Sequence, residues 1–278
     1  MPLADLTPAL DTFLEAGSAV TARRRKHRLL APIIASLEAA IARAFRAQGR
    51  AFMRRFARLK GKFPILEEAI GERDWLPFFT AAELETIRAF TDPMDRFVAR
   101  AMAAGGKAAT ALLGNVGAGI SFDLKNPRAV AFLRRYGADR VTMINDTTRS
   151  ILKSIVTEAV ESGWSYDRTA EAIISRFAEF AVGKPQLHID SRAHLVAVTE
   201  SANAYEASHR VVVDDLMDGG LAIQASWLTV GDDRVSDECR ANQDQGWIPA
   251  SEEFQSGHAH PPRFPGCRCC ALYRRKPK

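Results

Sequence analysis

The chain has 278 residues, of which 26% are charged and 8% aromatic, and these values are typical of a folded protein with enough apolar residues to bury a core. No N-terminal segment has the layout of a signal peptide, and no uncharged apolar run is long enough to cross a bilayer, so we expect an intracellular product that does not enter a membrane. The net charge of +5 is unevenly distributed. Residues 1–60 hold 12 Lys and Arg against 4 Asp and Glu, residues 61–262 hold 20 against 29, and residues 263–278 hold 6 against none. Two basic ends favour contact with a polyanion.

A cationic run follows the first predicted helix, which spans Thr7 to Ala22. Each phosphate that such a run neutralises releases counterions, so the run is a candidate DNA contact. A solvated helix face and a protein-docking patch are the alternatives, because no aromatic residue that can stack on bases interleaves with the cations. The candidate DNA-binding residues are Arg23, Arg24, Arg25, Lys26 and Arg28.

The next segment, Ile33 to Lys60, is predicted as a long helix with one narrow apolar stripe. Such a stripe needs a partner helix, and packing in the core of the same chain is our first interpretation, with docking onto another protein second. The stripe consists of Ile33, Leu37, Ile41, Phe45, Gln48, Phe52, Phe56 and Leu59.

A second pair of helices is expected before residue 114. Thr80 and Glu83 have the spacing of a capping box, which predicts a helix start at that point, and a further helix follows from Pro93. This helix ends in a glycine-rich stretch, Gly105 to Gly119, which predicts either close packing or a hinge. We place a domain boundary near Gly114 to Ser121.

From Phe122 onward the pattern predicts four helices and a small sheet. Asn126-Pro127 starts the first helix, Gly137 separates it from the second, Ser165 caps the third, and Asp190 or Ser191 caps the last. Short strands bounded by turn residues are predicted at 222–229, 246–248 and 269–274. The predicted fold is mainly α, with long N-terminal helices and a helical bundle followed by a small C-terminal antiparallel β-sheet (α+β). Residues 1–120 form a basic helical region, and residues 121–278 form a domain with helices at 126–218 and the sheet at 222–274.

Several motifs in this second part occur in a recognisable order. They are the helical stretch FDLKNPRAVAFLRRYGADRVTMINDTTRSILKSIVTEAVESGWSYDRTAEAIISRF, the segment AVTE at 197–200, the segment WLTVGDDRV at 227–235, and the ending PPRFPGCRC. Together they resemble the phage Mu F-like minor head (head morphogenesis) protein family over roughly residues 121–273.

The resemblance implies a non-enzymatic virion protein that associates with the portal inside the capsid, contacts packaged double-stranded DNA and aids head assembly or genome delivery. Other head proteins are further expected partners, the host cytoplasm is the place of assembly, and no membrane is involved. Two alternatives remain open: an enzyme or effector, toxin-related or nuclease-like, that uses Cys239 or the acidic turn at Asp232-Asp233, and a free DNA-binding protein.

Four cysteines near the C-terminus, in a chain without export signals, argue against a disulfide framework. Zinc prefers four Cys and His ligands, and a structural zinc ion held by Cys239, His260, Cys267 and Cys269 is one interpretation. Buried structural thiols, with no cofactor at all, are the simpler one.

Structural roles are expected for a further group of residues in and near the sheet. Asp233 and Arg234 are adjacent and can form a local ion pair in the turn, and Trp227 leads into that turn. Glu200 lies in the middle of a mostly apolar helix and is predicted to meet Arg234 or Arg268 from the sheet.

Overall fold

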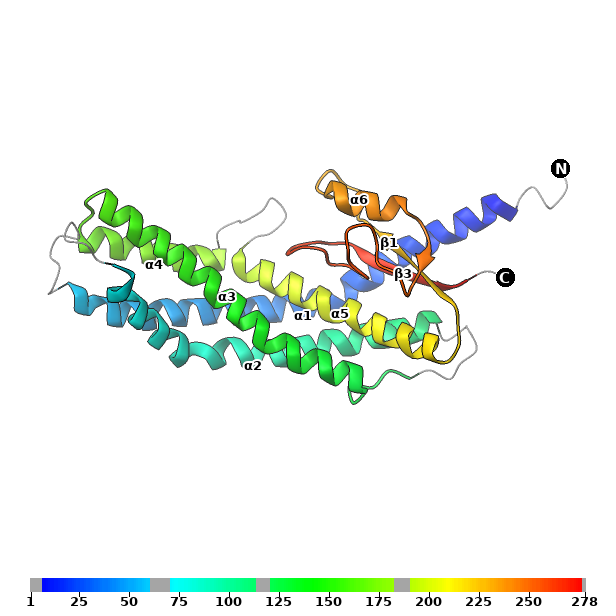
Figure 1. The fold of residues 1–278 in the computed structure, drawn as a ribbon, viewed down its shortest axis with the longest axis horizontal. Helices are drawn as coiled ribbons and strands as arrows, with labels where there is room; N and C mark the ends of the chain where they lie inside the picture. The colour runs from blue at the N-terminus through cyan, green and yellow to red at the C-terminus, as the bar shows by residue number, and fades with distance from the viewer. Residues whose placement is uncertain (1–6, 61–70, 114–120, 183–190, 277–278) are drawn as a thin grey trace. The chain divides into compact units, whose positions relative to one another are not determined.

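A computed structural model describes residues 7–60, 71–113, 121–182 and 191–276 of the chain. The architecture is mainly helical with a small C-terminal sheet, which confirms the predicted fold class (Figure 1). The helices are α1 (Thr7–Phe56), the short 3-10 helix η2 (Ala57–Leu59), α2 (Glu72–Leu113), α3 (Pro127–Glu161), α4 (Tyr166–Val182), α5 (Arg192–Asp218) and α6 (Asp237–Asp244). The strands are β1 (Ile223–Leu228), β2 (Ile248–Pro249) and β3 (Cys270–Arg275).

The chain divides into two compact units. Unit 1 comprises residues 1–34, 98–132 and 198–278, and unit 2 comprises residues 35–97 and 133–197. Helices α1, α2, α3 and α5 therefore each contribute a segment to both units. The predicted boundary near Gly114 to Ser121 lies almost wholly outside the described residues, and the division into 1–120 and 121–278 stays a prediction.

The helices are longer than the local sequence signals indicate. α1 runs through Pro32, although proline costs a helix interior about 3 kcal/mol. The apolar side chains of Leu30 and Ile33 on either side are buried, and burying each one stabilises the fold by about 1.5–3 kcal/mol, which offsets that cost. α2 likewise runs through Thr80, so the predicted capping box is wrong: Glu83 pairs with Arg149 instead.

The helix starts predicted in the second half are confirmed by side-chain caps. Asn126 Oδ1 accepts a hydrogen bond from the Arg128 N–H at 2.9 Å, and Ser165 and Ser191 accept equivalent bonds at the starts of α4 and α5. The predicted break at Gly137 is wrong, because α3 continues through it. One glycine in a long helix costs only about 1 kcal/mol, which packing on both sides of it offsets.

Unit 2 is held together by an aromatic core. The apolar stripe of α1 supplies Phe45, whose ring lies 5.3 Å from that of Phe90 and 5.1 Å from that of Phe180. Phe52 and Phe56 of the same stripe are fully buried as well. The interpretation of the stripe as core is thus confirmed, and it is not available as a docking surface for another protein.

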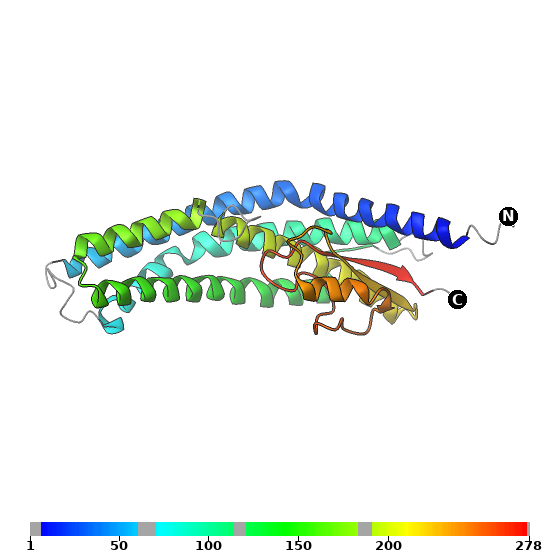
Figure 2. The same cartoon turned by 90° about the horizontal axis from the view of Figure 1, so that it is seen from above.

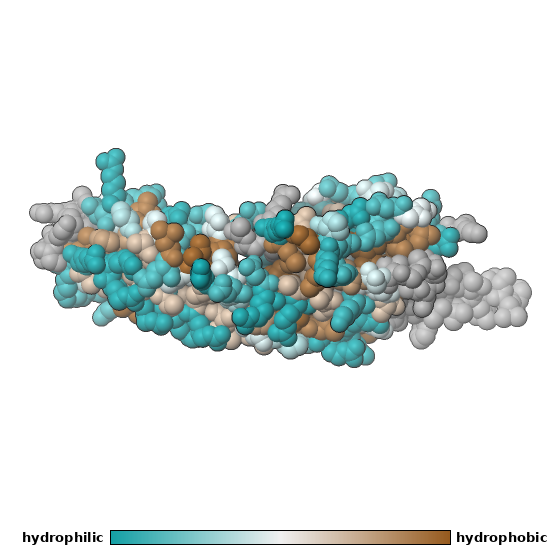
Figure 3. All heavy atoms as spheres, turned by 90° about the horizontal axis from the view of Figure 1, so that it is seen from below, coloured by the Kyte–Doolittle hydropathy of each residue, from teal (hydrophilic) through white to brown (hydrophobic). Residues whose placement is uncertain are grey.

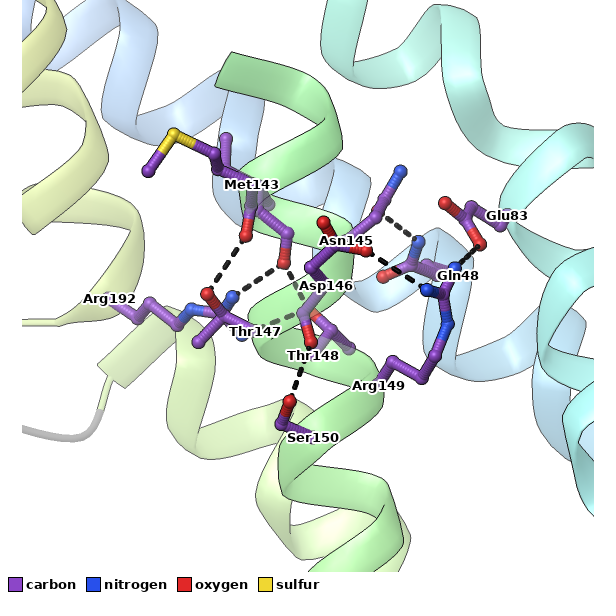
Figure 4. Close-up of polar contacts among 11 residues, drawn as sticks. Gln48, Glu83, Met143, Asn145, Asp146, Thr147, Thr148, Arg149, Ser150 and Arg192 are labelled. Carbon is purple, nitrogen blue, oxygen red and sulfur yellow. Dashed lines mark hydrogen bonds and ion pairs between the residues drawn. The ribbon is translucent and has the colours of Figure 1, made fainter. Parts of the chain in front are cut away.

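A buried polar network accompanies this core (Figure 4). The amide of Gln48, the one polar member of the stripe, donates to Asn145 Oδ1 of α3 at 2.9 Å. The Arg192 guanidinium donates to Thr148 Oγ1 and to the Ile144 carbonyl, and burial lowers the pKa of Arg192 to about 10. These bonds satisfy polar groups that would otherwise be costly to bury.

Unit 1 contains the sheet. Its strand order is β2-β1-β3, both pairings are antiparallel, and Trp227 of β1 lies opposite Ala271 of β3. β1 and β3 lie beside the N-terminal half of α1 in Figure 1, and Figure 2 shows β3 next to α5. Trp227 is fully buried and its ring packs edge to face on Phe254 at 5.3 Å.

Glycine in α2 permits close packing against α5 within unit 1. A Cβ at Gly105 would lie 2.5 Å from the Tyr205 carbonyl oxygen and 2.2 Å from Ser208 Oγ, distances that no side chain tolerates. The close-packing interpretation of the glycine-rich stretch therefore holds for Gly105. The later glycines of the stretch, Gly114 to Gly119, lie outside the described residues.

The outer surface is largely hydrophilic on the face shown in Figure 3, with smaller hydrophobic patches between the polar side chains. None of the described helices is long and apolar enough to cross a membrane. The large apolar side chains exposed among the described residues are Val20, Leu84, Ile87, Leu112, Met143 and Ile174.

Candidate functional site

Three thiols, of which Cys239 precedes the other two by 28 residues or more, meet inside unit 1. Cys239 lies in the first turn of α6, and Cys267 and Cys269 lie just before β3. The three sulfur atoms all lie within 4.8 Å of one another, and those of Cys239 and Cys267 are 4.0 Å apart. We call these three residues the thiol cluster. All three side chains are buried among the apolar residues of the unit 1 core.

Local structure explains why the sulfurs converge. Ser236 caps α6 and accepts a hydrogen bond from the Cys239 N–H at 3.3 Å, which places Cys239 at the positive end of the helix dipole. Gly266 has a φ of 83°, and this left-handed residue closes a tight turn in which the Cys267 N–H donates to the Phe264 carbonyl. The sequence did not predict α6, although Ser236 followed by two acidic residues is a helix-start signal.

Hydrogen bonds among the three thiols shift their pKa values. Hydrogen bonds from the Cys267 and Cys269 thiols lower the pKa of Cys239, with smaller contributions from Ser236 and Arg263. The same contacts raise the pKa of Cys267 and of Cys269, since the hydrogen bond to Cys239 favours their protonated forms. One thiolate held by two thiols is the arrangement that this describes.

His260, the fourth predicted ligand, and Cys270, the remaining cysteine, lie outside the thiol cluster. His260 Nδ1 lies 2.6 Å from the Pro261 carbonyl, and burial lowers the pKa of His260, although the Pro261 carbonyl and Glu206 act in the opposite direction. Cys270 is buried beside Lys26 and Glu206, and burial raises its pKa to about 12. The structure thus groups three of the four predicted zinc ligands and places His260 elsewhere.

Some residues of the cationic run contact the interior of unit 1, and others are exposed. Lys26 is buried: its Nζ lies 2.7 Å from Glu206 Oε1 on α5 and donates to the Cys269 carbonyl at 2.6 Å. Arg23 donates to the backbone carbonyls of Thr229 and Val230, at the end of β1. Two of the five predicted DNA-binding residues therefore hold the sheet onto α1.

Two of the remaining three cations of the run face solvent. Arg24 and Arg28 are exposed, and Arg25 is partly buried. Arg25 and Arg28 line an open groove between α1 and α2 in unit 1, with a volume of about 630 Å³. Arg100 and Lys107 from α2 line the same groove.

The sequence pattern did not single out these two α2 cations. They lie seven residues apart on one helix face, but which helix that face meets is a tertiary property. A second groove in unit 2 is also basic, and its charged lining residues are Arg43, Arg50, Arg88, Asp92 and Arg96.

The acidic turn is fastened to the sheet through its first carboxylate. Arg268 donates to both oxygens of Asp232 at 2.7 and 2.8 Å, and these bonds lower the pKa of Asp232. Asp233 and Arg234, predicted to pair locally, are both exposed. Glu200 is buried in α5, and its pairing with Arg234 or Arg268 stays a prediction.

A different acid on α5 supplies the main buried charge of unit 1. Glu206 is fully buried, pairs with Lys26 and accepts a hydrogen bond from the Ala271 N–H at 3.2 Å. It joins α1, α5 and β3 at one point. Its position on the face that carries Ala202 and His209 was visible in the helical spacing, but the cation that it meets lies 180 residues away in the sequence.

Comparison with known proteins identifies the region that contains these features. Residues 150–272 match the family model described as Phage Mu protein F like protein, a segment that begins within α3 and reaches into β3. No curated protein and no solved structure matches the chain significantly. The match confirms the resemblance predicted from the sequence motifs. Residues 150–272, less than half of the chain, are therefore similar to the phage Mu protein F-like family.

Proposed function

We propose that this protein is a minor head protein that associates with the portal inside the phage head, contacts the packaged DNA, and aids head assembly or genome delivery. The family match at residues 150–272 is the observation that carries this proposal. The basic character of residues 1–60 and 263–278 supports it, because a protein enclosed with packaged DNA meets a dense array of phosphates.

The DNA contact is assigned to the basic groove of unit 1. Arg28 and Lys107 are exposed on its two sides, and Arg25 and Arg100 add two further positive charges. The other lining residues are Ala, Leu and Ile, so the guanidinium and ammonium groups dominate the field in the groove. Binding through such cations is governed by counterion release and is independent of base sequence.

Replacing Arg28 and Lys107 together by serine tests this assignment. We expect weaker binding to double-stranded DNA, because two phosphate contacts are lost. The slope of log affinity against log salt should fall by about 2, at roughly 0.9 for each contact. Fluorescence anisotropy with a labelled duplex over a range of salt concentrations measures both quantities.

The matched control uses the basic groove of unit 2. Arg43→Ser with Arg96→Ser removes the same charge from exposed positions in that groove. Binding and salt slope close to those of the unaltered protein are expected for this control. Equal losses in the two double variants would instead indicate attraction by net charge alone and would refute the assignment to the unit 1 groove.

Portal association is tested by co-expression of the full chain with the portal protein of the same phage. Deleting residues 1–60 is unsuitable as a test, because α1 supplies buried residues to both units and its loss would disrupt both cores. Gel filtration with mass measurement should show co-elution with the portal ring and give a stoichiometry. Separate elution of a folded chain would argue against direct portal binding and leave the family assignment untouched.

A further inference from the structure

We propose that the thiol cluster formed by Cys239, Cys267 and Cys269 is a binding site for one thiophilic divalent cation such as zinc. This inference is independent of portal or DNA binding. It differs from the ligand set expected from the sequence, because it omits His260.

The spacing of the sulfur atoms fits a metal centre. Zinc binds thiolates at about 2.3 Å in a tetrahedral arrangement, which places any two sulfurs about 3.8 Å apart. The Cys239 and Cys267 sulfurs are 4.0 Å apart, and no pair in the cluster exceeds 4.8 Å. A shift of about 1 Å or less in each sulfur–sulfur distance would therefore close the three thiolates around one ion.

The surroundings of the cluster also suit bound thiolates. Arg263 lies beside the Cys239 sulfur, and the first turn of α6 directs its helix dipole at the same atom. Backbone N–H groups of Arg263 and Cys269 donate toward the Cys267 sulfur. Three thiolates and a divalent cation carry a net charge of −1, and the nearby guanidinium of Arg263, which also pairs with Glu238 at 3.1 Å, is the cation beside them.

Coordination by three sulfurs leaves one tetrahedral position. The Ser236 hydroxyl contacts Cys239 and is placed at the same end of α6, so it is the protein group assigned to that position or to a water molecule held there. A cluster of ordinary core thiols needs no hydrogen bonds to its sulfurs, since free cysteine packs as a small hydrophobic residue.

Zinc content of the purified full chain, prepared under reducing conditions and reloaded with zinc alone, tests the proposal. We expect one zinc per chain in the unaltered protein, and its loss in Cys239→Ser and Cys267→Ser. Two matched controls should keep the metal: Cys270→Ser, which removes the neighbouring buried thiol outside the cluster, and His260→Ala, which removes the ligand predicted from the sequence.

A second measurement does not depend on how well the variants fold. X-ray absorption of the zinc-loaded, unaltered protein should show three sulfur ligands at about 2.3 Å. No zinc binding by the unaltered protein, zinc retained in folded Cys267→Ser, or zinc lost in folded His260→Ala would each overturn the three-thiolate site.

Discussion

Replacing Lys26 by methionine is expected to lower the free energy of unfolding by about 3–5 kcal/mol, the usual cost of removing one partner of a buried ion pair. The Lys26 ammonium is the cation that faces the fully buried Glu206 carboxylate, and it also donates to the Cys269 carbonyl. Burial by itself would lower the pKa of Lys26, but the attraction of Glu206 outweighs it and the pKa is raised. Chemical denaturation followed by circular dichroism measures the loss.

Two further variants distinguish loss of the buried ion pair from a general effect of substituting a cation in α1. Arg24→Met changes an exposed cation two residues earlier in α1 and should alter stability by no more than about 0.5 kcal/mol. Adding Glu206→Gln to Lys26→Met removes the unpaired charge while keeping an acceptor for the Ala271 N–H, so it should recover part of the loss. A Lys26→Met protein as stable as the unaltered one would contradict the role assigned to this pair.

Acidification is expected to destabilise the protein through His209. This side chain is buried in α5, its ring lies 4.5 Å from that of Tyr205, and burial lowers its pKa from 6.5 to about 4. Below pH 6.5 the unfolded chain therefore binds a proton that the folded protein excludes, and stability falls as the pH decreases from 6.5 to about 4. Between pH 7 and pH 5 this one group should lower the free energy of unfolding by about 2 kcal/mol.

His209→Phe isolates that contribution, because phenylalanine keeps a ring beside Tyr205 and Tyr273 but cannot take up a proton. Urea denaturation at pH 7 and pH 5 should show a loss of stability about 2 kcal/mol smaller in this variant than in the unaltered protein. His27→Ala, at an exposed histidine of α1, is the control and should retain the full pH dependence. Identical pH dependence in His209→Phe and the unaltered protein would show that His209 is not responsible.

Local sequence signals predicted the second half of the chain better than the first. Asn126, Ser165 and Ser191 cap helices as expected, because a cap depends on side chains within three residues of one another. The breaks expected around Thr80 and at Gly137 did not occur, because α2 and α3 continue where burial of side chains elsewhere on the helix outweighs a weak local preference. The family motifs lie in the well-predicted part.

The candidate site was likewise predicted only in part from the sequence. Residue type marked Cys239, Cys267 and Cys269 as soft-metal ligands, and the cationic run marked α1 as a polyanion contact. Their spacing could not show that His260 lies apart from the thiols, or that Lys26 is turned inward to Glu206 while Arg28 faces a groove shared with Lys107.

The sequence by itself therefore determined the fold class, the family resemblance of residues 150–272 and the chemical character of each segment, since these depend on near neighbours and on side-chain chemistry. Only the tertiary structure decided which thiols meet and which cations are exposed. The thiols meet across 28 positions of the chain, and the exposure of each cation depends on how α1 packs against the sheet and α5, through contacts between residues about 180 or more positions apart.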